Sequence, residues 1–172
     1  MEYTSGHWSL DIYPGNDGTA LVHNTAILVG DITLGKNVTI HPYAQLVGVI
    51  TIGDNTVIGS HCNILGDVII GANVKTQSNA FIPGGTIIGD NVFIGPSVTI
   101  LNDKFPPSEG KSWMPVIIKD GATVGGGVTI LPGVTVYENA SIGGGSVVTK
   151  SIPQGSLAYG NPAQIKGMAE RA

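Results

Sequence analysis

Four residues able to take part in polar chemistry recur at intervals of eighteen positions: Tyr43, His61, Asn79 and Ser97. An imidazole can act as a general base near neutral pH because its ordinary pKa is about 6.5. A carboxamide can orient an acceptor or donate a hydrogen bond to a developing oxyanion. His61 and Asn79 are therefore candidate catalytic residues. Polar side chains at regular spacing also face solvent in many proteins, so both interpretations stay open at this point.

Two glycine triplets, residues 125–127 and 143–145, also lie eighteen positions apart. If residues at this spacing stack on one another, the triplets form a strip without side chains. A long, thin ligand can lie on such a strip and bond to its exposed peptide groups. The same glycines would also suit two tight corners. The candidate cofactor contacts are Gly126, Gly127, Gly144 and Gly145.

A strict repeat of six residues must position both patterns. An aliphatic residue recurs at every sixth position from Leu28 to Ile100, with Thr76 as the exception, and the ladder resumes in phase from Ile118 to Val148. A helix repeats every 3.6 residues and a strand every two, so neither gives this period. A coil of short parallel strands does, with three hexads per turn. Residues eighteen apart are then predicted to lie in neighbouring coils.

The rest of the chain divides around this coil. Turn-forming residues near the N-terminus predict a cap over the first coil. A stretch with three prolines and no hexad register predicts a projecting loop, expected beside the polar residues described above. A short helix is expected near the C-terminus, at 163–170. The expected segments of this single domain are a cap (1–25), coils (26–101), a loop (102–117), further coils (118–150) and a tail (151–172).

Composition limits the classes of partner. A net charge of -4 and a pI of about 5.4 argue against nucleic acid, which favours a basic surface. No apolar run approaches the roughly twenty residues of a membrane span, and no signal-peptide pattern begins the sequence. The one cysteine, Cys62, is interpreted as core filler and can form no disulfide within the chain, so the cytoplasm is the expected compartment. No metal, membrane or nucleic-acid partner is predicted.

The hexads resemble those of the hexapeptide-repeat acyltransferases. This resemblance implies a left-handed coil, a hand that periodicity alone does not decide and that departs from the usual right-handed crossover. With the loop and tail added, the expected fold is an all-β, left-handed parallel β-helix of hexapeptide repeats with a projecting loop and a short C-terminal helix.

The run Gln77-Ser78-Asn79, the stretch 92–99 and the pair Asn102-Asp103 are similar to the nucleotide-sugar N-acetyltransferases of that family. The resemblance implies transfer from acetyl-CoA to the amine of a nucleotide-linked amino-deoxysugar, by a homotrimer. It places Asn79 at the acceptor and the thioester. It also implies sugar contacts from the loop and CoA contacts from the tail. These residues are Asn102, Asp103, Phe105 and Pro106 for the sugar, and Lys150, Asn161, Pro162 and Lys166 for CoA.

The expected mechanism is direct attack of a neutral amine on the thioester carbonyl, which needs alignment and oxyanion stabilisation more than a strong base. O-acetyltransferases of similar fold use a His-Pro pair in the loop as base for a hydroxyl. No histidine follows His61 in this sequence, which favours an amine acceptor and also disfavours the zinc site of a γ-class carbonic anhydrase.

Two alternatives remain from the sequence. His61 could serve as the base of a sugar O-acetyltransferase, or the coil could be a non-catalytic scaffold. The irregular loop and the Gly-Asn-Pro-Ala tail argue against a scaffold. Gly89 and Pro107 stand where the N-acetyltransferases often have Glu and Arg, so the resemblance does not fix the acceptor.

Overall fold

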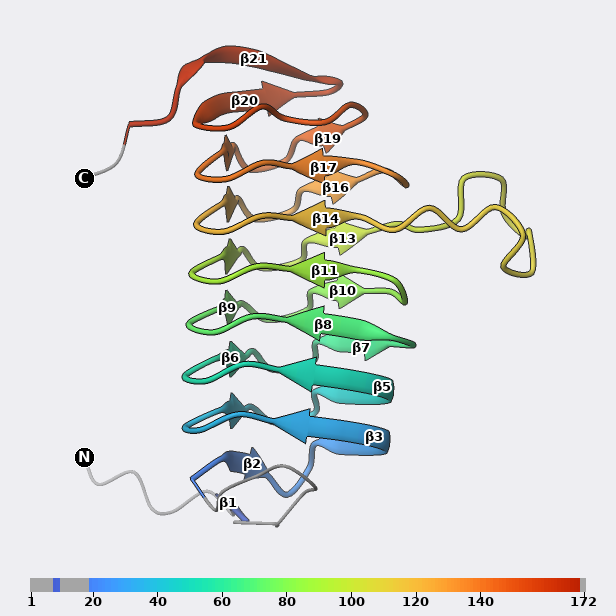
Figure 1. Ribbon diagram of the computed structural model, residues 1–172, viewed down its shortest axis with the longest axis vertical. Helices are drawn as coiled ribbons and strands as arrows, with labels where there is room; N and C mark the ends of the chain where they lie inside the picture. Colours follow the sequence, from blue (N-terminus) through green and yellow to red (C-terminus); the bar gives the residue numbers. More distant parts are fainter. Residues whose placement is uncertain (1–7, 10–18, 171–172) are drawn as a thin grey trace.

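The computed structural model describes residues 8–9 and 19–170. It is one stack of coils, with the C-terminal strands at the opposite end from β1 and β2 (Figure 1). At the base, β1 (Trp8–Ser9) pairs antiparallel with β2 (Leu21–His23). The other residues of the expected cap before residue 19, which are 1–7 and 10–18, lie outside the described residues.

Each regular coil has three short strands joined by three corners, so the stack has three faces. Face 1 is a ten-stranded sheet in which neighbouring strands are parallel except at its two ends. After β1 and β2, its strands are β4 (Thr39–Ile40), β6 (Val57–Ile58), β9 (Lys75–Thr76), β12 (Phe93–Ile94), β15 (Thr123–Val124), β18 (Ser141–Ile142), β20 (Ser156–Gly160) and β21 (Ala163–Met168).

Faces 2 and 3 belong to one eleven-stranded sheet, because β3 (Ile27–Leu34) and β5 (Gln45–Ile52) run around the corner between them. β5 pairs with β7 through its first half and with β8 through its second half. Face 2 contains β7 (Asn63–Leu65), β10 (Phe81–Ile82), β13 (Thr99–Ile100), β16 (Thr129–Ile130) and β19 (Val147–Val148). Face 3 contains β8 (Val68–Ile70), β11 (Ile87–Ile88), β14 (Ile117–Ile118) and β17 (Thr135–Val136).

Strand pairing follows the hexads. Val57 pairs with Lys75, eighteen residues further on, whereas Phe93 pairs with Thr123, thirty residues further on. The coil that carries the loop is thus longer by two hexads, so the ladder keeps its phase. Every ladder residue from Leu34 to Val148 is buried, Thr76 included. The predicted parallel β-helix is confirmed.

The hand of the coil is visible in Figure 1. Strands of face 3 lie nearest the viewer and run to the left, and the chain returns behind them as it rises, which is the left-handed sense that the resemblance implied. The corner between faces 3 and 1, here called corner 3–1, carries asparagines with φ near +57°, a conformation that asparagine tolerates better than most residues. They are Asn37, Asn55, Asn73, Asn91 and Asn139.

The expected C-terminal helix is wrong. Residues 163–168 form β21, which pairs antiparallel with β20, while β20 pairs in parallel with β18 of the coil below. A helix this short gains little stability by itself, whereas a strand here covers the exposed edge of face 1. No helix of any kind occurs in residues 8–9 and 19–170, so none there could span a membrane.

Candidate active site

The polar column predicted from the eighteen-residue spacing is present at the corner between faces 1 and 2, here called corner 1–2. The amide of His61 donates to the carbonyl of Pro42 at 3.2 Å, and the amide of Asn79 to that of Ser60 at 3.0 Å. Its four members all adopt left-handed backbone conformations, with φ between 56° and 64°. Their repeated geometry places equivalent residues above one another on one edge of the stack.

The two glycine triplets continue this edge upward. The amide of Gly127 donates to the carbonyl of Pro96, and the amide of Gly145 to that of Gly126, both at 2.8 Å. A Cβ on Gly125 would lie 2.6 Å from the amide nitrogen of Gly144, so the two backbones are in close contact. The predicted stacking is confirmed. The glycines expose a strip of bare backbone directly above the polar column.

Asn79 and His61 differ in what surrounds their side chains. Among the described residues, nothing hydrogen-bonds to the side-chain carboxamide of Asn79, and the residue is exposed. The side-chain amide of Asn79 is therefore free to bind a ligand. The His61 ring stacks on that of Tyr43, with centroids 4.9 Å apart and planes 20° from parallel. No described residue hydrogen-bonds to either imidazole nitrogen of His61, whereas a general base in an enzyme is usually oriented by such a partner.

A small cleft of about 140 Å³ lies beside the column on face 1. The residues that line this cleft were not among the site residues predicted from the sequence. Three of them, His41, Gly59 and Gln77, nevertheless share the eighteen-residue spacing of the column. That spacing is the signal that could have identified them. The lining also includes Val57, Ser60, Thr76 and Ser78.

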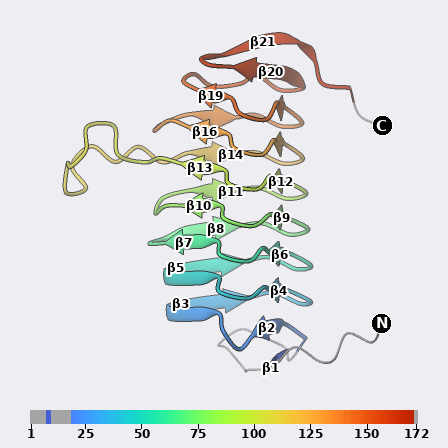
Figure 2. The same cartoon turned by 180° about the vertical axis from the view of Figure 1, so that it is seen from behind.

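The loop does not lie beside the column, contrary to the expectation from sequence. It connects β13 of face 2 to β14 of face 3, so it leaves the stack at the corner between these faces, here called corner 2–3 (Figures 1 and 2). Asn102, at its base, donates from its side chain to the carbonyl of Gly84 at 2.9 Å. Gly84 is five residues beyond Asn79, or about 16 Å of extended chain. The column and the loop therefore occupy opposite edges of face 2.

Asp103 organises the loop from within. Its carboxylate accepts hydrogen bonds from the amides of Phe105 and Ser108, at 3.1 and 2.9 Å, and from the Ser112 hydroxyl at 2.7 Å. Partial desolvation raises the pKa of this carboxyl, but the hydrogen bonds from Ser108, Ser112 and Phe105 together outweigh it and lower the pKa below its ordinary value. Asp103 thus remains ionised and holds the loop together.

The other two predicted sugar contacts lie further out on the loop. Phe105 is 68% exposed and is approached by the Lys104 ammonium, 5.6 Å from the ring centroid. Pro106 is exposed beside it. The structure therefore separates the four predicted contacts into two that anchor or organise the loop and two that project from it.

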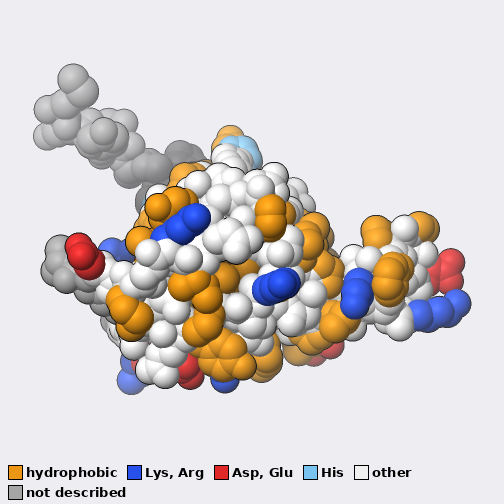
Figure 3. Space-filling model, turned by 90° about the horizontal axis from the view of Figure 1, so that it is seen from above, with side chains coloured by type: hydrophobic (Ala, Val, Ile, Leu, Met, Phe, Trp, Pro, Cys, Tyr) orange, Lys and Arg blue, Asp and Glu red, His pale blue; other side chains and the backbone are white. Residues whose placement is uncertain are grey.

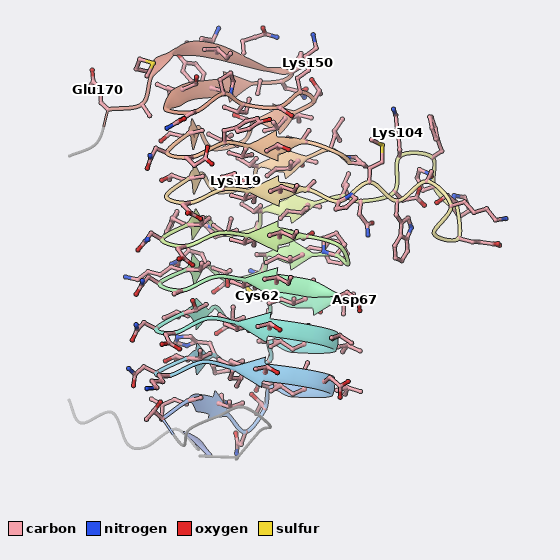
Figure 4. The ribbon with its side chains drawn as sticks, viewed as in Figure 1. Cys62, Asp67, Lys104, Lys119, Lys150 and Glu170 are labelled. Carbon is pink, nitrogen blue, oxygen red and sulfur yellow. The ribbon has the colours of Figure 1, made fainter. Side chains whose placement is uncertain are left out.

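The end of the loop packs against the coils below and above its own coil. Trp113 is part of a cleft of about 370 Å³ at corner 2–3, and the Asp67 labelled below the loop in Figure 4 lines the same cleft. The Met114 side chain packs over Gly133, where its Cε would lie 2.7 Å from an added Cβ. The other residues lining the cleft are Gly66, Gly84, Gly85 and Pro115.

The predicted CoA residues of the tail lie at the top of the stack. Lys150 and Pro162 line one cleft of about 330 Å³, together with residues of β21. The Lys166 ammonium lies elsewhere, 5.5 Å from the ring centroid of Tyr159. Figure 3 shows lysine side chains on this end of the molecule, where they suit the phosphates of a nucleotide.

The turn between β20 and β21 contains Asn161 and Pro162 and lies above the glycine strip. The Gly160 amide before this turn donates to the Ser146 hydroxyl at 3.1 Å, and the Tyr159 side chain packs against Gly143. The glycine strip and the turn between β20 and β21 therefore meet at corner 1–2. Within the part of the chain that the structure describes, no group of three or more histidine, cysteine or acidic side chains could hold a metal ion.

Two family models match the repeat region. The one described as bacterial transferase hexapeptide (six repeats) matches residues 31–66 and 67–102, and the one described as hexapeptide repeat of succinyl-transferase matches residues 115–150. These stretches together cover more than half of the chain. The chain belongs to the hexapeptide-repeat transferases.

Several similar proteins are named for a nucleotide-linked amino sugar or were solved with one bound. The dTDP-3-amino-3,6-dideoxy-alpha-D-galactopyranose 3-N-acetyltransferase of Aneurinibacillus thermoaerophilus is 67% identical over 30 residues, which are 17% of this chain and 16% of that protein. PerB from Caulobacter crescentus, solved with CoA and GDP-perosamine, has a TM-score of 0.54 at 22% identity, over 87% of this chain and 57% of PerB.

A mutant of AntD, an N-acyltransferase from Bacillus cereus, was solved with dTDP-4-amino-4,6-dideoxyglucose and coenzyme A. It has a TM-score of 0.60 at 18% identity, over 91% of this chain and 83% of AntD. Likeness at this level of identity establishes the fold. This hexapeptide-repeat transferase spans little more than half the length of PerB and matches a small fraction of the curated relative.

Proposed function

We propose that this protein is an acetyl-CoA-dependent N-acetyltransferase that acts on a nucleotide-linked amino-deoxysugar, for surface polysaccharide or glycan biosynthesis. The single observation that carries this proposal is the arrangement of corner 1–2. A free carboxamide, that of Asn79, lies on the same edge as a strip of bare glycine backbone. The names of the curated relative, PerB and AntD supply the substrate class.

The donor would lie along corner 1–2. In this arrangement the pantetheine arm follows the glycine strip, and the phosphates of CoA lie near Lys166 at the top of the stack, whereas Lys150 follows β19 at corner 2–3 on the other edge of face 2. Gly145 and Asn79 are three coils apart, about 14 Å at the spacing of paired strands. The thioester would then reach the level of Asn79, and the side-chain amide of Asn79 can donate to the carbonyl oxygen of the thioester.

The chemical step needs little proton transfer before attack. The neutral amine adds to the thioester carbonyl and forms a C–N bond, with negative charge on the oxygen that the Asn79 amide stabilises. The oxyanion then re-forms the carbonyl, the C–S bond breaks, and the electron pair leaves with the sulfur. The proton lost by the nitrogen goes to the CoA thiolate. An amide and free CoA result.

We also propose that the enzyme is a cytoplasmic homotrimer. Corner 1–2 and the loop are at opposite edges of face 2, so a neighbouring copy could bring its loop to this chain's Asn79. Face 3 carries a patch of exposed aliphatic side chains, and monomeric proteins seldom leave a large apolar patch uncovered. Val49, Ile69 and Ile87 are 54%, 54% and 42% exposed there. Light scattering at several concentrations should give three times the mass of the chain.

CoA thiol release tests the activity, with acetyl-CoA offered against dTDP-, UDP- and GDP-linked 3- and 4-amino sugars and the corresponding hydroxyl sugars. Asn79→Ala should lower kcat/KM about 100-fold, a loss typical of an oxyanion donor. Asn91→Ala is the matched control, because Asn91 has the same residue type and a similar φ of 57° at corner 3–1. It should leave kcat/KM unchanged.

His61→Ala separates N- from O-acetylation. Turnover of an amino sugar that survives His61→Ala supports attack by a neutral amine. Turnover of hydroxyl sugars that disappears in His61→Ala would instead establish a sugar O-acetyltransferase with His61 as base. Absence of both turnover and acetyl-CoA binding would make the coil a scaffold.

A further inference from the structure

Two of the polar side chains buried in the core of the coil touch each other. Thr76 is the exception in the ladder, and Cys62 occupies an inward position that other coils fill with small residues. Both are buried, and the Cys62 sulfur lies 3.5 Å from the Thr76 hydroxyl oxygen. At the position equivalent to Cys62, five other coils carry fully buried residues, which are Ala44, Ala80, Val98, Val128 and Ser146.

This pair lies directly behind the corner that carries Asn79. The Cys62 thiol donates to the carbonyl of Gln77 at 3.1 Å, and the amide of Gly59 is shared between the Thr76 carbonyl at 3.0 Å and the Thr76 hydroxyl at 3.2 Å. Burial raises the pKa of the Cys62 thiol, so the thiol stays protonated and remains a donor. The two core residues thus bond to the corner segments of both Asn79 and His61.

The same corner is fixed from below by Gly59. A Cβ at Gly59 would lie 2.6 Å from the carbonyl carbon of Gln77 and 2.8 Å from the amide nitrogen of Ser78. The backbone of one coil therefore rests on the next at this point, and the Asn79 amide bonds down to Ser60 at 3.0 Å. Because the backbone of residues 77–79 is held from inside and from below, the direction in which the Asn79 side chain leaves it is fixed.

The fold does not require polar residues at these two positions. Aliphatic residues fill all other ladder positions from Leu34 to Val148, and alanine or valine replaces Cys62 in four other coils. The one other polar residue at the Cys62 position, Ser146, lies behind the glycine strip and donates to the carbonyl of Gly143. At corner 1–2 the buried polar residues in this inward position are thus Cys62, beside the polar column, and Ser146, behind the glycine strip, while Thr56 and Thr86 occupy the corresponding positions at the other two corners.

We propose that Cys62 and Thr76 are positioning residues, which fix the Gln77–Asn79 corner so that the Asn79 carboxamide is aimed at the reacting thioester. The inference rests on the proposed role of Asn79. Neither side chain reaches the substrate, since both are buried in the coil. Their effect on the reaction is expected in kcat, because alignment matters most in the transition state.

The test compares Thr76→Val and Cys62→Val, which remove the hydroxyl or thiol but keep a side chain that this core accepts, with Cys62→Ser, which keeps a donor. Thr56→Val is the matched control. Thr56 is also buried, donates to the carbonyl of Gly71 at 2.8 Å and accepts from the amide of Val74 at 3.0 Å, but it lies at corner 3–1.

Thr76→Val and Cys62→Val should each lower kcat about ten-fold with KM for acetyl-CoA within about two-fold of the parent. Cys62→Ser should recover most of the loss. Thr56→Val should keep the parent kcat even though it lowers the melting temperature, because it leaves the Val74 amide unsatisfied. Equal kcat in the parent and in the Thr76 and Cys62 valine variants would overturn the proposal.

Hydrogen exchange of the free protein gives a second readout that needs no substrate. Amides of residues 77–80 should exchange about ten-fold faster in Thr76→Val and Cys62→Val than in the parent, and at the parent rate in Thr56→Val. If the parent acetylates no acceptor, the proposed function fails, and exchange alone then decides whether the pair fixes the corner. Unchanged exchange at residues 77–80 in both valine variants would contradict that role.

Discussion

Corner 1–2 and the loop at corner 2–3 lie on opposite edges of face 2 and are held in different ways. At corner 1–2 the turn has the same length in successive coils, and backbone hydrogen bonds join each turn to the one below, as from Asn79 to Ser60. In the loop, the Asp103 carboxylate accepts three hydrogen bonds from its own segment, and a few backbone hydrogen bonds join the two arms of the loop. The repeat thus supplies a rigid edge for chemistry, and the loop can vary without disturbing it.

The rigid edge should tolerate no added atom where two backbones meet. Gly125→Ala places a Cβ 2.6 Å from the amide nitrogen of Gly144, so the upper coils must separate. We expect a loss of about 3 kcal/mol in the free energy of unfolding, measured by urea denaturation. Gly127→Ala is the control, because its Cβ would meet only the Gly145 amide nitrogen, at 4.0 Å. It should cost about 1 kcal/mol for its φ of 67°. Equal losses would refute the close stacking.

The loop should affect the acceptor rather than the donor. Asp103→Ala removes the acceptor of three hydrogen bonds and should loosen the segment around Phe105. We expect kcat/KM for the amino sugar to fall about ten-fold while KM for acetyl-CoA stays within about two-fold, measured by steady-state kinetics with each substrate varied. Glu109→Ala is the control, since Glu109 is exposed in the same loop and pairs only with Lys111. A larger change in the KM for acetyl-CoA would assign the loop to the donor.

The smallest expected effect is a pH dependence of loop order. The hydrogen bonds lower the pKa of Asp103 in the folded chain below its ordinary value of 3.8. They therefore stabilise the loop fully at pH values above 3.8, and this stabilisation is lost as the pH falls through the lowered pKa. Trp113 forms a backbone β-bridge with Asp103, so its fluorescence reports the order of the loop. The measurement uses a Trp8→Phe variant, which leaves Trp113 as the single tryptophan. Its fluorescence should be constant from about pH 8 to about pH 5 and change only below about pH 4. A transition near pH 6 would point to a histidine instead.

The repeat made most of corner 1–2 predictable from sequence. A period of six places residues eighteen apart in adjacent coils, and the stacking of Gly145 on Gly126 follows from that arithmetic alone. The same arithmetic could have separated the loop from the column, because Asn102 is one coil and five residues beyond Asn79. That step was missed when the loop was expected beside the column.

The tail and the core pair were less accessible to sequence reasoning. Residues 163–168 include alanine, glutamine, lysine and methionine, all good helix formers, and the strand they form depends on the free edge of β20. Thr76 was visible as the exception in the ladder, and Cys62 as a small inward residue. That the two meet behind Asn79 required the three-dimensional contacts, since they belong to adjacent coils.

The most direct test of whether corner 1–2 carries the donor is calorimetric titration of CoA into Gly145→Asn, Gly121→Asn and Asp103→Ala. Asparagine accepts the φ of 69° at Gly145 and 67° at Gly121, so neither substitution strains the chain, and asparagines already occupy corner 3–1. Gly145→Asn puts a side chain on the strip and should raise the Kd for CoA at least ten-fold, about 1.4 kcal/mol. The other two variants should bind CoA as the parent does. Parent-like binding by Gly145→Asn, or lost binding in Asp103→Ala, would contradict the assignment of the donor to this corner.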